Sequence, residues 1–294
     1  MNIEEYKFST ILSQSDCKTL NTLTDKAAEP MLTHGIDAIG LSYLTANTLY
    51  EIGMERSCIM LALADPFVKF GIITLDEAQR LFGDDIARLL TLIMKLRQKT
   101  ITLDNISDKQ FSDFVLSFAE DIRVVITGVA YSHELMKELD KMPDELEGRK
   151  RQAALSRLFY APIAHRLGLY SIKRDLEDLS VKFEHPDIFY EIVHGLKQTR
   201  NEREKYLEDF ISSLREKIEA LGISYEIKWR TKSIHSIYQK MVAQGVGIDG
   251  IYDLFALRVI LDIPENLEKA FCWAVFGVTS SLYVPNMLRT KDWV

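Results

Sequence analysis

The chain has 294 residues and a mass of 33.8 kDa, a length that suits two domains better than one. Hydrophobic residues make up 47% and charged residues 27%, which is typical of globular proteins and excludes a mainly disordered chain. The formal charge is −7, with 16 Lys and Arg against 24 Asp and Glu in residues 1–150 and 20 against 19 in residues 151–294, so the acidic first half is poorly suited to binding DNA.

The first two hundred residues have the apolar spacing of consecutive helices. Thr74 and Glu77 form a capping-box pattern in front of an apolar helical stripe, and Gly83 stands where that helix should end. Further stripes at helical spacing recur and are typical of a buried core. We expect an all-α domain over residues 1–145, followed by a helical linker over residues 146–200.

Beyond residue 200 the period of the pattern changes. A long amphipathic helix comes first, and apolar residues then alternate with polar ones over 223–229, which indicates a half-buried strand. A helix over 234–242, a β-prone run over 256–261 and a helix over 265–282 follow. This order predicts the start of an α/β or α+β domain over residues 201–294, within a chain that is mostly α.

Cysteine usage and hydropathy favour the cytoplasm. No apolar run approaches the ~18 residues of a membrane span, and the N-terminus carries acids where a signal peptide carries bases. The three cysteines, Cys17, Cys58 and Cys272, are too few and too scattered for a disulfide framework or a zinc knuckle. We expect a cytoplasmic protein with no membrane partner.

The most informative segment is the basic stretch from Lys228 to Lys240, which contains four Lys or Arg and no acid. Arg230 and Lys232 should leave the end of a strand on the same side, because strand side chains alternate. Ser236 and Lys240 lie four residues apart and should share one face of the following helix. Together with the start of that helix they form a candidate phosphate site, although a solvated basic face fits the spacing equally well.

Asp253 and Arg258 bracket the apolar run that follows. A carboxylate at the edge of a strand, beside a phosphate site, is how nucleotidyl-type enzymes hold Mg²⁺, a hard cation that prefers oxygen ligands. The alternative is that Asp253 only ends a turn.

These segments resemble the start of the nucleotidyltransferase-like synthetase domain of the RelA/SpoT homologues, long enzymes that make and degrade the alarmones ppGpp and pppGpp. The family's R-x-K-x-x-x-S-I-Y-x-K-M reads here from Arg230 to Met241, and its D-L-x-A-x-R-V-I from Asp253 to Ile260. Its R-x-K-D reads from Arg289 to Asp292. Upstream, Tyr160 to Gly168 resembles the family's interdomain linker and Ala119 to Val125 its hydrolase domain.

The resemblance implies a synthetase of the stringent response, which passes a pyrophosphoryl group from ATP to the 3′-hydroxyl of GDP or GTP. Asp253 would be the catalytic residue and would hold Mg²⁺. The family's N-G-Y-x-S-x-H segment and catalytic glutamate would come after Val294, so we expect an incomplete metal site and a catalytically silent fragment. Any ribosome association would need regions outside this sequence. The residues implied to bind nucleotide are Arg230, Lys232, Ser236, Lys240, Arg258, Arg289 and Lys291.

The first half resembles the family's HD hydrolase domain, but the expected metal ligands are replaced. Only Asp65 survives, and a divalent ion with three or four protein ligands cannot be held tightly by one carboxylate. We therefore expect a pseudo-hydrolase without Mn²⁺. The positions concerned are Gly40 to Ser42 for the first His, Ala64 and Asp65 for the His-Asp pair, Val68 and Lys69 for the Glu-Asp pair, and Tyr131 for the final Asp.

Two other functions stay open at this point. These residues could form a non-enzymatic regulatory module built on the pseudo-hydrolase helices. A metal-dependent ppGpp 3′-pyrophosphohydrolase is the third possibility, and the lost ligands disfavour it.

Overall fold

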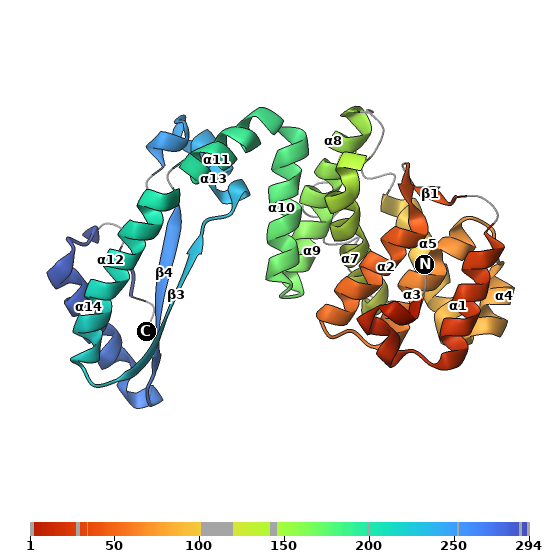
Figure 1. Cartoon of the computed structure of the whole chain (residues 1–294), viewed down its shortest axis with the longest axis horizontal. Coiled ribbons are helices and arrows are strands. Elements are labelled where there is room, and N and C mark those ends of the chain that lie inside the picture. The colour runs from red at the N-terminus through yellow and green to blue at the C-terminus, as the bar shows by residue number, and fades with distance from the viewer. Residues whose placement is uncertain are drawn as a thin grey trace. The chain divides into compact units, whose positions relative to one another are not determined.

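The computed structural model describes residues 3–27, 30–33, 35–100, 120–141, 146–198, 200–251, 253–287 and 290–292. The chain folds as two compact units, Met1–His185 and Pro186–Val294 (Figure 1). The described residues are mostly helical, which confirms the predicted fold class.

The first unit is a bundle of helices with one short two-stranded sheet at its edge (Figure 1). Its elements are η1 (Ile3–Glu5), η2 (Lys7–Ile11), α1 (Gln14–Lys26), β1 (Leu32–Thr33), β2 (Ile36–Asp37), α2 (Ala38–Glu51), α3 (Arg56–Lys69), α4 (Leu75–Phe82), α5 (Asp84–Thr100), α7 (Ile122–Glu138), η3 (Leu139–Lys141), α8 (Leu146–Leu155), the π-turn η4 (Ser156–Tyr160), α9 (Ala161–Arg166) and α10 (Tyr170–Glu184).

The centre of this unit consists of α2, α3 and α7, which are apolar on most of their circumference. Leu41, Leu49, Ile59, Leu63 and Val129 from these helices are almost completely buried. Because a helix that is apolar all round must be covered on every side, the remaining helices surround these three. At the rim, the predicted capping box is confirmed, since the Thr74 hydroxyl accepts from the Glu77 amide while the Glu77 carboxylate accepts from the Thr74 amide.

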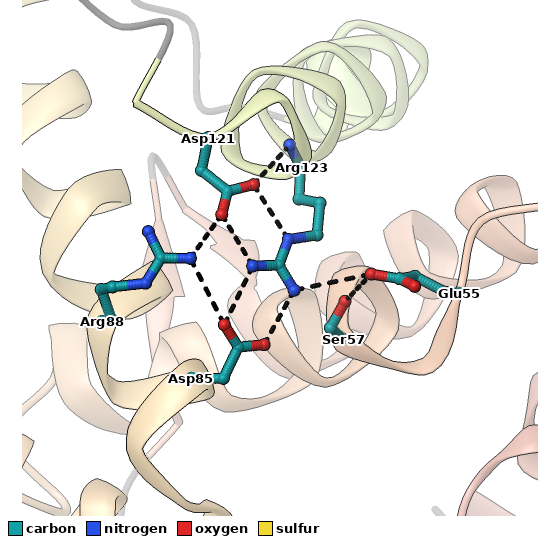
Figure 2. Close-up of polar contacts among 6 residues, drawn as sticks. All are labelled: Glu55, Ser57, Asp85, Arg88, Asp121 and Arg123. Carbon is teal, nitrogen blue, oxygen red and sulfur yellow. Dashed lines mark hydrogen bonds and ion pairs between the residues drawn. The ribbon is translucent and has the colours of Figure 1, made fainter.

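Figure 2 shows an ion-pair network that ties together the starts of α3, α5 and α7. Asp121 caps α7, and its carboxylate and that of Asp85 each accept two hydrogen bonds from the Arg123 guanidinium at 2.7–2.9 Å. Arg88 donates to Asp121 at 2.5 Å, and Glu55 lies 3.5 Å from Arg123. The hydrogen bond from Arg123 holds the pKa of Asp121 well below its usual range.

The helices over residues 146–184 belong to the first unit rather than forming a separate body. The Ser180 hydroxyl donates to the Ala153 carbonyl at 3.0 Å, and the Ser132 and Ser156 hydroxyls bond to each other at 3.0 Å. Of the helices in the expected linker, α8, α9 and α10 therefore lie in the first unit, and α11 (Pro186–Gln198) lies in the second.

His133 on α7 joins α10 to this bundle through buried charges. Its Nε2 lies 3.1 Å from Asp175 Oδ2 on α10, and its Nδ1 lies 3.0 Å from Glu134 Oε1. Glu134 also accepts from the Thr48 hydroxyl of α2 and from Lys137. Burial acts to lower the pKa of His133, but the hydrogen bond to Asp175 and the ion pair with Glu134 outweigh it, and the pKa is raised.

We expect His133→Gln to remove a pH-dependent part of the stability. A raised folded pKa means that the folded state binds the proton more tightly, so the stabilisation is complete below the unfolded pKa of about 6.5 and is lost as pH rises through the folded value. The variant should lose roughly 1–2 kcal/mol at acidic pH and little at alkaline pH. Urea unfolding from about pH 5.5 to 8.5 measures this, and parallel curves for both proteins would contradict it.

The second unit has an antiparallel pair of strands, joined through a helix and covered on one face by other helices. Antiparallel β3 (Ser224–Thr231) and β4 (Phe255–Asp262) pair from Ser224↔Asp262 to Thr231↔Phe255. The helices α12 (Arg200–Glu219) and α14 (Glu268–Leu282) lie along this strand pair (Figure 1). Side chains from one face of the strands pack with those of the two helices, including Leu214, Ile218 and Val275. The other elements are α11, α13 (Ile234–Gln244), η5 (Ile248–Gly250) and η6 (Glu265–Leu267).

The order of elements predicted beyond residue 200 is confirmed. The strand over 223–229, the helix over 234–242 and the run over 256–261 correspond to β3, α13 and β4. Among the described residues, no helix combines the length and the apolar character that crossing a membrane requires.

Candidate functional site

Two sites follow from the sequence, one in each unit. The first is a cluster of side chains around the positions where the resemblance places the hydrolase metal, and for that expectation alone it is called here the former metal pocket. It consists of Thr33, Asp65, Lys69, Arg97 and Tyr131. Asp65 and Lys69 come from α3, Arg97 from α5, Tyr131 from α7 and Thr33 from β1. The fold therefore brings together three of the predicted hydrolase positions, and it adds two residues that the sequence did not indicate.

The central contact of the former metal pocket is an ion pair. Arg97 Nη2 donates to Asp65 Oδ2 at 2.6 Å, and Asp65 is only 7% exposed. Lys69 donates to the Thr33 hydroxyl at 2.7 Å, and Tyr131 also hydrogen-bonds Thr33. The one carboxylate that survives in this pocket is therefore neutralised by a guanidinium of the same chain.

The replaced positions have pKa values that reflect this crowding. Part of the Lys69 side chain reaches solvent, yet the burial of its ammonium and then the positive charge of Arg97 lower the pKa to about 8. Burial raises the pKa of Tyr131 to about 12, so its hydroxyl stays neutral. At the other two positions, Ala64 is buried and Val68 half-buried, and neither side chain can bind a metal.

These residues do not fit a divalent metal ion. Within the described residues no group of three or more His, Cys, Asp and Glu side chains is arranged to hold one. A cation at Asp65 would have to displace Arg97 and stand next to Lys69, at a Coulombic cost. The residues present therefore give no support for Mn²⁺ in the first unit.

Arg97 was not identified from the sequence, although a signal was present. It follows Ile93 by four positions on the apolar stripe of α5, and residues four apart share a helix face. A cation on a core-facing stripe requires a partner, since a buried charge is stable only when it is paired. That requirement could have indicated a buried carboxylate nearby.

The second site, called here the basic cluster, consists of Lys232, Lys240 and Asp253. Lys232 follows β3, Lys240 lies on α13 and Asp253 precedes β4. Lys232 Nζ donates to Asp253 Oδ2 at 2.8 Å, and Lys240 Nζ donates to the same oxygen. The Lys232 amide also donates to the Leu254 carbonyl at 2.8 Å, which fixes the backbone beside the site.

The charges of the basic cluster balance each other only in part. Burial acts to raise the pKa of Asp253, but the hydrogen bonds from Lys232 and Lys240 hold it at about 2. Burial lowers the pKa of Lys232, with Lys240 contributing in the same direction. One carboxylate thus faces two ammonium groups.

Three of the other predicted nucleotide-binding residues, Arg230, Ser236 and Arg258, lie on β3, α13 and β4, the elements that carry or adjoin the basic cluster. Arg230 and Arg258 are exposed on β3 and β4, and Arg258 pairs directly opposite Lys228, where like charges repel. Ser236 takes part in the start of α13, because its amide donates to the Ser233 hydroxyl at 3.2 Å. Lys291 lies in the described range 290–292, whereas Arg289 lies outside the described residues.

Comparisons with known proteins follow the same division. The family model of the HD domain matches residues 18–170, and the model of a region found in RelA and SpoT proteins matches residues 229–294. The chain is 30% identical over 273 residues to a GTP pyrophosphokinase of Myxococcus xanthus, covering 92% of this chain and 34% of that protein.

Two further relatives show the same extent of similarity. A guanosine-3′,5′-bis(diphosphate) 3′-pyrophosphohydrolase of Aquifex aeolicus is 30% identical over 274 residues, covering 92% of this chain and 36% of the relative. The bifunctional (p)ppGpp synthase/hydrolase SpoT of Escherichia coli K12 is 28% identical over 273 residues, covering 92% and 37%. The chain spans about a third of the length of these relatives.

Proposed function

This chain belongs to the RelA/SpoT family, with an HD domain in its first unit, and on that premise we propose that its second unit is part of a (p)ppGpp synthetase. The reaction would transfer a pyrophosphoryl group from ATP to the 3′-hydroxyl of GDP or GTP in the cytoplasm. The observation that supports this most is the meeting of Lys232 and Lys240 on Asp253, while Arg230 and Arg258 are exposed on the strands that adjoin Lys232 and Asp253.

Phosphoryl transfer depends mainly on charge neutralisation and alignment, and these residues provide both. With a triphosphate present, Lys232 and Lys240 would turn from Asp253 to phosphate oxygens. Asp253 would then be free to hold Mg²⁺, which when bound with phosphate oxygens neutralises their charge. Asp253 alone offers one carboxylate, so the residues fit Mg²⁺ only together with the nucleotide.

For the first unit we propose a pseudo-hydrolase that does not cleave ppGpp and acts as a non-enzymatic module. The Arg97–Asp65 ion pair supports this, because it occupies the only carboxylate left among the expected ligand positions. In such domains a water molecule needs a bound metal to become a strong nucleophile at neutral pH. The described residues include no group of side chains arranged to hold a metal ion.

The test of the synthetase proposal is ATP binding by the whole chain in the presence of Mg²⁺, measured by calorimetry. Lys232→Ala and Lys240→Ala should each weaken ATP binding by about one to two orders of magnitude, since charged contacts contribute about 1.5–3 kcal/mol. Lys217→Ala on the exposed side of α12 is the matched control and should bind as the wild type does.

Two results would contradict the proposal. The wild-type chain could fail to bind ATP while its second unit is folded, which the fluorescence of Trp229 and Trp273 would show. Alternatively, Lys232→Ala and Lys217→Ala could bind ATP equally well, in which case the basic cluster would be a solvated surface.

A further inference from the structure

The former metal pocket carries more positive than negative charge among the described residues. The charged side chains that meet there are Asp65, Lys69 and Arg97, and the titratable groups facing them from α7 and η4 are the phenols of Tyr131 and Tyr160. Two cations therefore face one carboxylate. Arg97 and Lys69 repel each other, and among the described residues Asp65 is the charged group of the pocket that opposes this repulsion.

The cations also have hydrogen-bonding capacity left. Arg97 has five N–H donors, and in the described residues one of them is bonded, to Asp65. The Arg97 side chain is 31% exposed, and part of the Lys69 side chain reaches solvent, so a small ligand can approach both. The bond to Asp65 fixes the guanidinium in place, which lowers the entropic cost of binding a ligand to its other donors.

We propose that the former metal pocket is a metal-independent oxyanion site, in which Arg97 and Lys69 bind a phosphate or pyrophosphate group. This inference rests on the silent-hydrolase part of the proposed function and extends it from a lost activity to a retained binding site. A planar guanidinium binds phosphate through paired N–H groups, and an adjacent ammonium adds charge. The Tyr131 hydroxyl lies beside Arg97 and Asp65.

The experiment is a calorimetric titration of inorganic pyrophosphate into the whole chain in EDTA. Lys232→Ala and Lys240→Ala are introduced first, so that the basic cluster does not contribute. In this background, Lys69→Met and Arg97→Met should each weaken pyrophosphate binding about tenfold or more. Asp65→Asn keeps the shape of the side chain but removes the negative charge, and it should strengthen binding by a few-fold.

Lys69→Met keeps the Arg97–Asp65 ion pair, so it stays informative if Arg97→Met fails to fold, which circular dichroism would reveal. Titrations with inorganic phosphate, GDP and ppGpp then distinguish a free anion from the phosphates of a nucleotide. Binding that is unaffected by Lys69→Met and by Asp65→Asn would overturn the proposal, as would the absence of pyrophosphate binding in the background protein.

Failure of this inference is distinguishable from failure of the proposed function. Mn²⁺-dependent release of pyrophosphate from ppGpp would contradict the pseudo-hydrolase, whatever the EDTA titration shows. If pyrophosphate does not bind and ppGpp is not hydrolysed, only the proposal of an oxyanion site is contradicted.

Discussion

Substitution of Arg123 by Met is expected to lower the free energy of unfolding of the first unit by about 2–4 kcal/mol, because it removes charge-assisted hydrogen bonds to two carboxylates. Of the two carboxylates, Asp121 loses more free energy when the hydrogen bonds from Arg123 are removed, because only 9% of its side chain is exposed. Arg88 would still bond Asp121 at 2.5 Å and Asp85 at 3.3 Å, but it would not replace the contact with Glu55 or the paired bonds that Arg123 gives each carboxylate (Figure 2).

Urea unfolding of three variants measures this. Arg88→Met should cost less than Arg123→Met, because the Arg88 side chain is 49% exposed. Arg80→Met on the exposed side of α4 should change the free energy of unfolding by less than about 0.5 kcal/mol. Similar losses for Arg80→Met and Arg123→Met would show that the network contributes nothing specific.

The same network predicts sensitivity to acid. The lowered pKa of Asp121 means that its contribution is complete above the unfolded aspartate pKa of about 3.9 and disappears as pH falls toward the folded value. Arg123→Met should therefore lose less stability at low pH than at neutral pH.

Incubation of the chain with ppGpp and Mn²⁺ is expected to release no pyrophosphate above a protein-free blank. Metal binding lowers the pKa of water from 15.7 to about 7. Without a metal, the fraction of the attacking water that is ionised to hydroxide at neutral pH is therefore lower by about nine orders of magnitude. Asp65→Asn is the matched control and should give the same blank. Mn²⁺-dependent release that Asp65→Asn abolishes would contradict the expectation.

The sequence predicted those features that depend only on residues close together in the chain. The capping box at Thr74 and Glu77 needs only four consecutive residues, and the change of period after residue 222 marks β3 directly. The convergence of Lys232 and Lys240 also followed from local geometry, because both lie within one stretch of nine residues that contains the connection between a strand and a helix.

Contacts between distant helices were not predicted. Arg97 and Asp65 are separated by 32 residues on different helices, and helical periodicity shows which face is buried but not which faces meet. The role of Asp253 shows a related limit. The resemblance assigned it to Mg²⁺, which stays a prediction, whereas in the structure its nearest opposite charges are Lys232 and Lys240.

The most direct test of the replaced metal site is a titration of Mn²⁺ followed by electron paramagnetic resonance, in which free hexaaqua Mn²⁺ gives a strong signal that binding removes. Wild-type chain and Asp65→Asn should give the same titration curve, because Arg97 already occupies the carboxylate that the substitution removes. Any weak binding elsewhere, for example at Asp253, would be common to both proteins. A stoichiometric Mn²⁺ site in the wild-type chain that is lost in Asp65→Asn would contradict the account.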